Sequence, residues 1–138
     1  MRKSWDEWYM ELAEFWTHRS KDPKRKVGAI ITLDNYCIGT GFNGFPRNIE
    51  DTKARLADKV IKNMIMIHAE ENALRVAGHR GDTCYVTYFP CAPCLGKLSQ
   101  AGITRVVVPK LESDTKWNQG LVLELAEEAG IDVEVLDD

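Results

Sequence analysis

Apolar runs that suit β-strands alternate with segments of helical periodicity along almost the whole chain. Strands separated by helices are typical of a sheet with parallel strands, whereas two runs joined by Asp34 and Asn35 predict an antiparallel hairpin. The pattern therefore predicts an α/β fold with one mixed sheet of about five strands and helices on both faces. The expected helices span residues 5–19, 63–77, 91–101 and 120–129, and the expected strands span residues 27–33, 36–43, 83–88, 104–108 and 132–136.

The first predicted helix carries a stripe of large apolar side chains. These side chains recur at three- and four-residue intervals and comprise Trp5, Trp8, Leu12, Phe15 and Trp16. We interpret the stripe as a core-facing surface rather than a ligand platform. The polar segment that follows the hairpin, up to about Lys62, is expected to be a loop or short helix.

The length and composition limit the class of protein. A chain of 138 residues suits one domain, here residues 1–138, and no apolar run is long enough to cross a bilayer. The N-terminus mixes charged and apolar residues, unlike a signal peptide, so we expect a cytoplasmic protein with no membrane partner. Its four cysteines are then expected to be reduced, with Cys37 and Cys84 in strands as core residues.

The net charge of −3 is the reverse of what binding to a nucleic-acid backbone requires. Nucleic acid is therefore a disfavoured partner. The basic residues cluster within residues 18–26, a stretch that could bind a single phosphate group. From charge alone, a solvated basic loop explains this cluster about equally well.

Two short motifs carry the chemistry, and they are informative only together. His68 and Glu70 begin one predicted helix section, and Cys91 and Cys94 begin another. One histidine and two cysteines make three protein ligands, which leaves the fourth position of a tetrahedral zinc open, as a catalytic site needs. Cys91 and Cys94 share a helix face, and a helix N-terminus favours the thiolate form. We predict one catalytic Zn²⁺ held by His68, Cys91 and Cys94.

Glu70 is not needed as a fourth ligand. Side chains in the first turn of a helix tilt toward its N-terminus, so both His68 and Glu70 can approach an ion placed there. A carboxylate beside the metal can accept a proton from water and return protons to the substrate, so we predict Glu70 as the catalytic base and acid. Considered alone, Glu70 is explained better as an ordinary acidic residue at a helix N-terminus.

His-x-Glu followed by Pro-Cys-x-x-Cys is the signature of zinc-dependent deaminases. Beyond it, the chain resembles the deoxycytidylate deaminase family between about residues 20 and 108. The matching elements are Ser20–Pro23, Val27–Ala29, Gly41–Pro46, His68–Ala73 and Phe89–Cys94. Of these, Gly41–Pro46 is the element that distinguishes this family from other members of the zinc deaminase superfamily.

The resemblance implies a three-layer α/β/α fold and hydrolysis of dCMP to dUMP and ammonia. It further implies that Asn43 contacts the sugar, that Ser20 and Lys24 meet the 5′-phosphate, and that Trp117 closes over the substrate. An equally good interpretation of Trp117 is an aromatic residue that anchors its own loop.

Many members of the resembled family are hexamers that dCTP activates and dTTP inhibits. The resemblance therefore implies a homo-oligomer with an effector site around Asn43, Gly44 and Asp51, and Mg²⁺ accompanying dCTP. The run Ile49–Asp51 departs from the Ser-Asp-Asp of many relatives, which leaves the details of effector binding open. Without cysteine or histidine in residues 47–63, we expect no second zinc.

Two other functions remain as alternatives. The first is another zinc deaminase, acting on tRNA adenosine, on a polynucleotide cytosine or on free cytidine, although the acidic balance disfavours a polynucleotide. The second is a nonenzymatic protein in which zinc only staples the fold. The open ligand position and the presence of Glu70 argue against that alternative.

Overall fold

The computed structural model describes residues 1–112 and 119–136. Its centre is a five-stranded sheet in the order β2-β1-β3-β4-β5, formed by β1 (Gly28–Leu33), β2 (Tyr36–Phe42), β3 (Thr83–Val86), β4 (Arg105–Val108) and β5 (Asp132–Val135). β1 is antiparallel to both β2 and β3, whereas β3, β4 and β5 are parallel. The predicted α/β fold with a mixed five-stranded sheet is confirmed.

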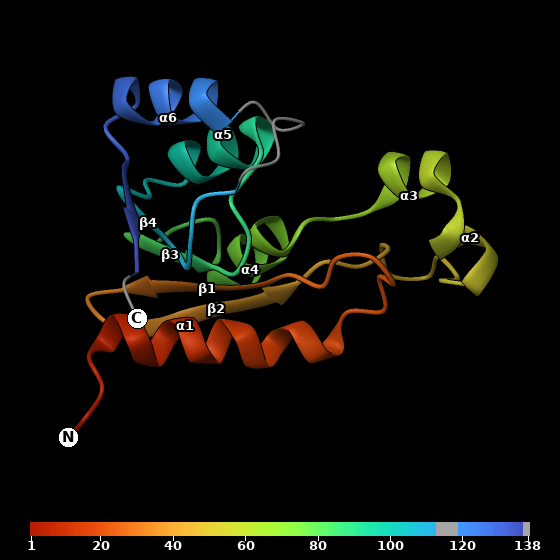
Figure 1. Ribbon diagram of the computed structural model, residues 1–138, viewed down its shortest axis with the longest axis horizontal. Helices are drawn as coiled ribbons and strands as arrows, with labels where there is room; N and C mark the ends of the chain where they lie inside the picture. Colours follow the sequence, from red (N-terminus) through yellow and green to blue (C-terminus); the bar gives the residue numbers. More distant parts are fainter. Residues whose placement is uncertain (113–118, 137–138) are drawn as a thin grey trace.

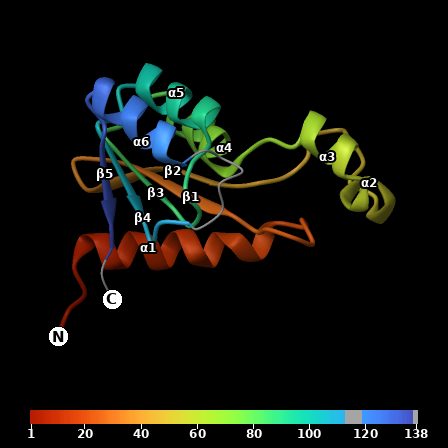
Figure 2. The same ribbon diagram turned by 45° about the horizontal axis from the view of Figure 1, so that its top comes forward.

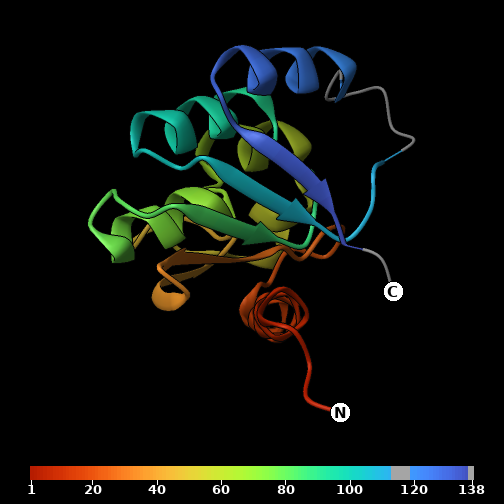
Figure 3. The ribbon, with the colours of Figure 1, turned by 90° about the vertical axis from the view of Figure 1, so that its left-hand side faces the viewer.

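Helices cover both faces of this sheet. Figure 3 shows this in a view in which the N-terminal helix is seen end-on. Of the helices in the described residues, only α1 (Trp5–Trp16) lies on one face (Figure 1). On the other face lie α4 (Ala69–Ala77), α5 (Ala92–Gln100) and α6 (Gln119–Glu128). The architecture is therefore three-layered, α/β/α.

The side chains of the central strands alternate between two cores. Ile30, Tyr85 and Val107 point toward α1 and pack with its buried residues. Their neighbours on the same strands point toward α4, α5 and α6, where they form the larger core: Ala29, Ile31, Cys84, Val86, Val106 and Val108. This alternation follows from the two-residue period of a strand. Both faces of the sheet carry apolar side chains because helices cover both.

The apolar stripe of α1 was predicted to face the core, and this prediction is wrong for three of its five members. Trp5, Trp8 and Phe15 are 57%, 55% and 70% exposed. The buried residues of α1 are Tyr9, Met10 and Ala13. A Cβ added to Gly28 would lie 1.9 Å from the Ala13 carbonyl oxygen, so α1 approaches β1 too closely for a large side chain there.

Two further sequence predictions need correction. Cys37 was expected in the core, but it is exposed, because β2 is an edge strand and the β1–β2 register shifts between Ile31 and Thr32. The helix expected from Asn63 to Ala77 is interrupted. α3 (Lys59–Ile65) ends first, and Ile67 then forms a β-bridge with Gly44 before α4 begins.

The segment between the hairpin and α4 extends away from the sheet. It contains α2 (Lys53–Ala57) and α3, which pack on each other and project beyond the body of the protein (Figures 1 and 2). Thr52 caps α2 and Asp58 caps α3 through side-chain hydrogen bonds to backbone N–H groups. None of the helices in the described ranges has the length and apolarity that crossing a bilayer needs.

Candidate active site

Two helix N-termini bring the predicted metal ligands together. His68 occupies the N-cap position of α4, and Cys91 occupies the N-cap position of α5, with Cys94 in its first turn. Neither N-cap side chain hydrogen-bonds to the helix that it begins. Helix starts are usually capped by Ser, Thr, Asp or Asn, so these two positions forgo capping in favour of a shared cluster.

The three ligand atoms of this cluster lie within 4.8 Å of one another. His68 Nδ1 is 3.1 Å from Cys94 Sγ and 3.5 Å from Cys91 Sγ. Zinc bonds measure about 2.0–2.1 Å to nitrogen and about 2.3 Å to sulfur, so atoms at these separations can share one ion. The mixture of one imidazole and two thiols is also the donor set that zinc prefers.

The cluster holds protons that a metal ion would displace. A hydrogen bond from Cys94 lowers the pKa of Cys91 to about 4, and the same contact together with burial raises the pKa of Cys94. A hydrogen bond with Cys91 raises the pKa of His68. Because ligands bind metals in their deprotonated forms, metal uptake here would release protons.

Glu70 lies beside these ligands and is buried. Burial raises its pKa to about 7, against smaller opposing effects of its own backbone N–H and of His68. A carboxyl group that gains and loses a proton near neutral pH is suited to general acid–base chemistry. The next residue, Glu71, instead points outward to an exposed ion pair with Lys97 at 2.7 Å.

A pocket of about 410 Å³ opens onto this cluster. Its volume falls within the range of small-molecule sites, about 300–1,000 Å³. Its lining combines the cluster with polar and basic side chains: Asp22, Lys24, Arg25, Asn43, Lys59, Lys62, Asn63, His68, Glu70, Tyr88 and Cys91. The pocket therefore brings a metal-ligand cluster, a buried carboxyl group and cationic side chains into one cavity.

Asp22 organises the basic loop on one side of this pocket. One oxygen of its buried carboxylate accepts hydrogen bonds from Lys24 N at 2.9 Å and from Lys62 Nζ at 3.0 Å. Burial raises the pKa of Asp22, but these hydrogen bonds outweigh that effect and leave it below its ordinary value. Ser20 is also buried, and its hydroxyl accepts from Asp22 N rather than lining the pocket, whereas Lys24 does line it.

The sequence analysis missed the contribution of α3 to this pocket. Lys59, Lys62 and Asn63 line it, although they belong to a segment that was expected to be a polar loop or short helix. No local sequence signal distinguishes these residues from solvated ones. The contact with Asp22, which lies forty residues away in sequence, brings them to the pocket.

Asn43 and Gly44 hold the pocket wall in place through backbone contacts. Asn43 Oδ1 accepts from Val27 N at 2.9 Å, and its Nδ2 donates to Arg25 O at 2.8 Å. Gly44 exchanges two hydrogen bonds with Ile67, directly before His68. Asp51 forms an exposed ion pair with Lys21 at 3.4 Å, and Trp117 lies outside the described residues.

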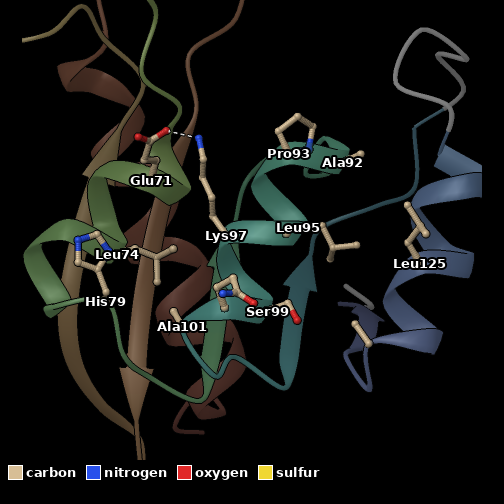
Figure 4. Close-up of a pocket in the computed structure, with 13 residues that line it drawn as sticks. Glu71, Leu74, His79, Ala92, Pro93, Leu95, Lys97, Ser99, Ala101 and Leu125 are labelled. Carbon is tan, nitrogen blue, oxygen red and sulfur yellow. Dashed lines mark hydrogen bonds and ion pairs between the residues drawn. The ribbon is translucent and has the colours of Figure 1, made fainter.

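A larger hollow of about 890 Å³ lies between α4, α5 and α6 (Figure 4). Its lining is mostly small or apolar, including Leu74, Leu95 and Leu125, with the Glu71–Lys97 ion pair at one side. It does not include the His68 cluster. Volume alone would favour this hollow as a ligand site, but the metal ligands His68 and Cys91 and the buried Glu70 line the smaller pocket.

A mixed α/β sheet with a His-Cys-Cys cluster and a buried glutamate at two helix starts defines the class of zinc-dependent deaminases. Residues 3–110 match the sequence model described as the cytidine and deoxycytidylate deaminase zinc-binding region. The chain therefore belongs to the cytidine and deoxycytidylate deaminase family, whose members are zinc-dependent aminohydrolases.

Individual relatives agree with this placement. The chain is 34% identical to an uncharacterized deaminase of Aliivibrio fischeri, over 96% of this chain and 94% of that one. It is 34% identical to the deoxycytidylate deaminase of Mycobacterium phage D29, over 79% and 97%. It is 38% identical to that of Saccharomyces cerevisiae over 78% of this chain, but spans 38% of that protein's length.

A solved structure shows the same fold. The apo dCMP deaminase of cyanophage S-TIM5 superposes with a TM-score of 0.77 at 26% identity, covering 99% of this chain and all of that one. The three-layer fold predicted from the sequence is thus shared with a deaminase of known structure.

Proposed function

We propose that this chain hydrolyses dCMP to dUMP and ammonia, using one zinc ion. The observation that carries the proposal is the buried Glu70 carboxyl beside the His68, Cys91 and Cys94 ligand atoms, in a pocket with basic lining. Two relatives named deoxycytidylate deaminase support the choice of substrate.

The metal would be held by His68 Nδ1 and by the sulfur atoms of Cys91 and Cys94. When bound, zinc supplies Lewis acidity, which lowers the pKa of a water molecule in the open ligand position toward neutrality. The two helix N-termini add partial positive charge on the same side and favour the thiolate forms of the cysteines.

Glu70 moves the protons of the reaction. Its carboxylate accepts one proton from the attacking water and delivers it to ring nitrogen N3 as the oxygen bonds to C4. It then carries the remaining hydroxyl proton to the amino nitrogen, which leaves as ammonia while C4 becomes a carbonyl. The proton count balances with one water consumed, and Glu70 returns to its starting state.

The remaining pocket residues bind and orient the nucleotide. Asn43 contacts the sugar with the hydrogen-bonding capacity that Val27 and Arg25 leave unused. Lys24 meets the 5′-phosphate, and Lys59 adds a second cationic side chain from α3. Ser20 acts on this site through the turn that it forms with Asp22. By the resemblance to the family, Trp117 would close over the substrate.

The proposal extends to regulation and assembly. An effector site around Asn43, Gly44 and Asp51 would take dCTP, with Mg²⁺, as activator and dTTP as inhibitor. Because Gly44 pairs with Ile67, an effector at this loop would act directly on the segment that ends at His68. The enzyme would work as a cytoplasmic hexamer of single-domain chains spanning residues 1–138.

The substrate is tested by supplying deoxycytidine, cytidine, dCMP and dCTP separately to zinc-loaded protein and measuring ammonia release. Turnover restricted to dCMP supports the proposal, and stimulation of that turnover by added dCTP supports the effector site. Turnover of cytidine, or of a tRNA adenosine substrate in place of dCMP, would show a different deaminase. No turnover of any of these, with zinc retained, would favour a structural zinc protein.

Replacing Glu70 by Gln tests the proton carrier. We expect Glu70→Gln to keep its zinc and fold but to lose activity by about 10²–10⁴-fold, because general acid–base catalysis contributes that much. The matched control is Glu71→Gln, the same change one residue further along, where the side chain makes only an exposed ion pair. Equal activities of the two variants would remove Glu70 from the mechanism.

A further inference from the structure

The buried carboxylate of Asp22 has one oxygen without a hydrogen bond from the protein. The side chain is 7% exposed and belongs to the lining of the pocket that contains the ligand cluster. Its Oδ1 accepts from Lys24 N at 2.9 Å, from Arg25 N at 3.3 Å and from Lys62 Nζ at 3.0 Å. Within residues 1–112 and 119–136, Oδ2 accepts no hydrogen bond. Buried polar atoms are nearly always paired, so Oδ2 indicates a binding partner that is not part of the chain.

The partner of Oδ2 must donate a hydrogen bond, because an ionised carboxylate can only accept. Burial raises the pKa of Asp22, but the hydrogen bonds from Lys24, Lys62 and Arg25 outweigh that effect and hold the pKa below its ordinary value. Asp22 is therefore ionised at neutral pH. A hydrogen bond to such a carboxylate is charge-assisted and about twice as strong as one between neutral groups.

The surroundings of Asp22 favour a neutral donor. A metal cation at Oδ2 would be repelled by the Lys62 ammonium, which lies 3.0 Å from Oδ1 of the same carboxylate. A phosphate group is an anion at neutral pH, so the carboxylate itself would repel it. A hydroxyl group carries no charge and meets neither objection.

The proposed substrate offers one such hydroxyl group. Apart from its phosphate, dCMP has two hydrogen-bonding donors, which are the amino group on C4 and the 3′-hydroxyl of the sugar. The amino group is the leaving group of the reaction and belongs beside the metal ligands. The 3′-hydroxyl is therefore the donor that remains for Asp22.

Asn43 is held against the same residue as Asp22. Arg25 donates its backbone N–H to Asp22 Oδ1, and its backbone oxygen accepts from Asn43 Nδ2 at 2.8 Å. The Asn43 amide has a second N–H, which this contact does not use. A hydroxyl group donates one hydrogen bond and accepts others, so one sugar hydroxyl can donate to Asp22 and accept from Asn43.

Lys62 keeps the acceptor in place. The Lys62 and Asp22 side chains are 12% and 7% exposed, so both charges of this ion pair have lost most of their hydration. Such a pair adds little net stability, because desolvation offsets the attraction between the charges. Its effect here is to fix a charged acceptor in the wall of the pocket, at the junction of the basic loop and α3.

We propose that Asp22 accepts a hydrogen bond from the 3′-hydroxyl of the deoxynucleotide and makes the enzyme selective for nucleotides with a free 3′-hydroxyl. Asn43 donates to the same hydroxyl oxygen, and Lys62 is a positioning residue that acts through Asp22. This inference rests on the proposed function, because it takes a deoxycytidine nucleotide as the ligand of the pocket.

The test compares kcat/KM for dCMP and for 2′,3′-dideoxycytidine 5′-monophosphate, which lacks only the 3′-hydroxyl, on the zinc-loaded wild type. We expect the dideoxynucleotide to react with a kcat/KM about 10–100-fold lower, because it leaves a buried charged acceptor unpaired. Equal values would show that only solvent pairs with Oδ2, and would overturn the assignment.

Two variants separate the carboxylate from its ion pair. Asp22→Asn and Lys62→Met both lose the contact between these side chains, but only the first loses the carboxylate. We expect the preference for dCMP over the dideoxynucleotide to fall several-fold in Asp22→Asn and to persist in Lys62→Met. Because each ratio compares two substrates on one sample, the fraction of folded protein cancels. An unchanged ratio in Asp22→Asn, or an equal loss in both variants, would remove Asp22 as the acceptor.

Failure of the proposed function would give a different result. A wild type that releases no ammonia from dCMP would overturn the proposed function and the Asp22 assignment together. A wild type that deaminates dCMP and its dideoxy analogue equally well would leave the proposed function intact and overturn the Asp22 assignment alone.

Discussion

The starts of α1 and α4 have acidic residues at the same helical positions and use them for opposite purposes. In α1, Ser4 is the N-cap, and its hydroxyl and the Glu7 carboxylate satisfy each other's backbone N–H groups. In α4, the N-cap is His68, which makes no capping hydrogen bond. The first start stabilises its helix, and the second gives up that stabilisation to aim a ligand at a metal.

The second helical positions differ in the same way. Asp6 of α1 receives hydrogen bonds from Arg105 and Tyr85, and the Arg105 guanidinium lowers its pKa. Glu70 of α4 is buried, and burial raises its pKa to about 7. Packing against a cation therefore lowers the pKa of a carboxyl group at a helix N-terminus, whereas dominant burial raises it.

The largest effect is expected when the N-cap of α4 is changed to the serine that caps α1. His68→Ser creates the sequence of a capping box with Glu71, so α4 should form at least as well as before. Loss of an outer-shell partner of a metal ligand typically lowers metal affinity or activity by about 10–100-fold. We expect the zinc affinity and the turnover of His68→Ser to fall by more than that, because the ligand itself is removed. Metal analysis and circular dichroism on the same sample check this. A variant that kept zinc would show that Cys91 and Cys94 suffice.

The position of α4 depends on small residues beneath it. A Cβ at Gly41 would lie 2.5 Å from both Ala69 O and Ala73 N, so Gly41→Ala must push α4 away from β2. We expect a loss of about 1–3 kcal/mol in the free energy of unfolding, together with reduced activity, because α4 begins at His68. Chemical denaturation measures the first effect.

The control for Gly41→Ala is Gly96→Ala in α5, where an added Cβ meets no atom within 4 Å. This variant should be stabilised by about 0.5–1 kcal/mol, since alanine favours a helix interior over glycine. If both variants were equally stable, the close contact between α4 and β2 would carry no energetic weight.

Replacing Asp6 by Asn removes the anion that Arg105 and Tyr85 hold at the start of α1. We expect a loss of about 1–2 kcal/mol at neutral pH, a partly exposed site giving less than a buried one. Because the folded pKa lies below the ordinary 3.8, this contribution is complete above pH 3.8 and disappears as the pH falls through the folded value. Denaturation of both proteins across pH should therefore show their stabilities converging in acid.

The smallest loss of stability should come from Ser4→Ala. It removes one side-chain cap from an exposed helix start, which costs about 1 kcal/mol. Turnover per folded molecule should not change, because no pocket residue belongs to α1. Thermal unfolding together with an activity assay checks both parts, and a loss of turnover would mean that α1 acts on the site.

The sheet and the ligand cluster could be predicted because their signals are local. Alternating apolar residues such as Ile30 and Ile31 predict a strand covered on both faces, whichever helices cover it. His68 and Cys91 stand at helix starts, and the spacing of the cysteines places both on one side of a turn. The chemistry of three such ligands does not depend on the details of packing.

The failures arise where distant segments decide the outcome. Helical periodicity gives α1 two adjoining apolar faces, and the close approach of Ala13 to Gly28 accompanies packing of the face that carries Ala13 on the sheet. Ile65 and Ile67 continue a helical pattern, but Ile67 pairs with Gly44 instead and ends it. Lys62 reaches the pocket through Asp22, a partner that no window of sequence contains.

A metal ion at the ligand cluster would also crosslink two distant parts of the chain. His68 and Cys91 are 23 residues apart, and the segment between them contains α4 and β3, the middle strand of the sheet. A metal ion there closes a loop around the most buried part of the molecule, in the way that a crosslink does. Removal of the ion would therefore free this loop in the unfolded chain and lower the free energy of unfolding of the domain.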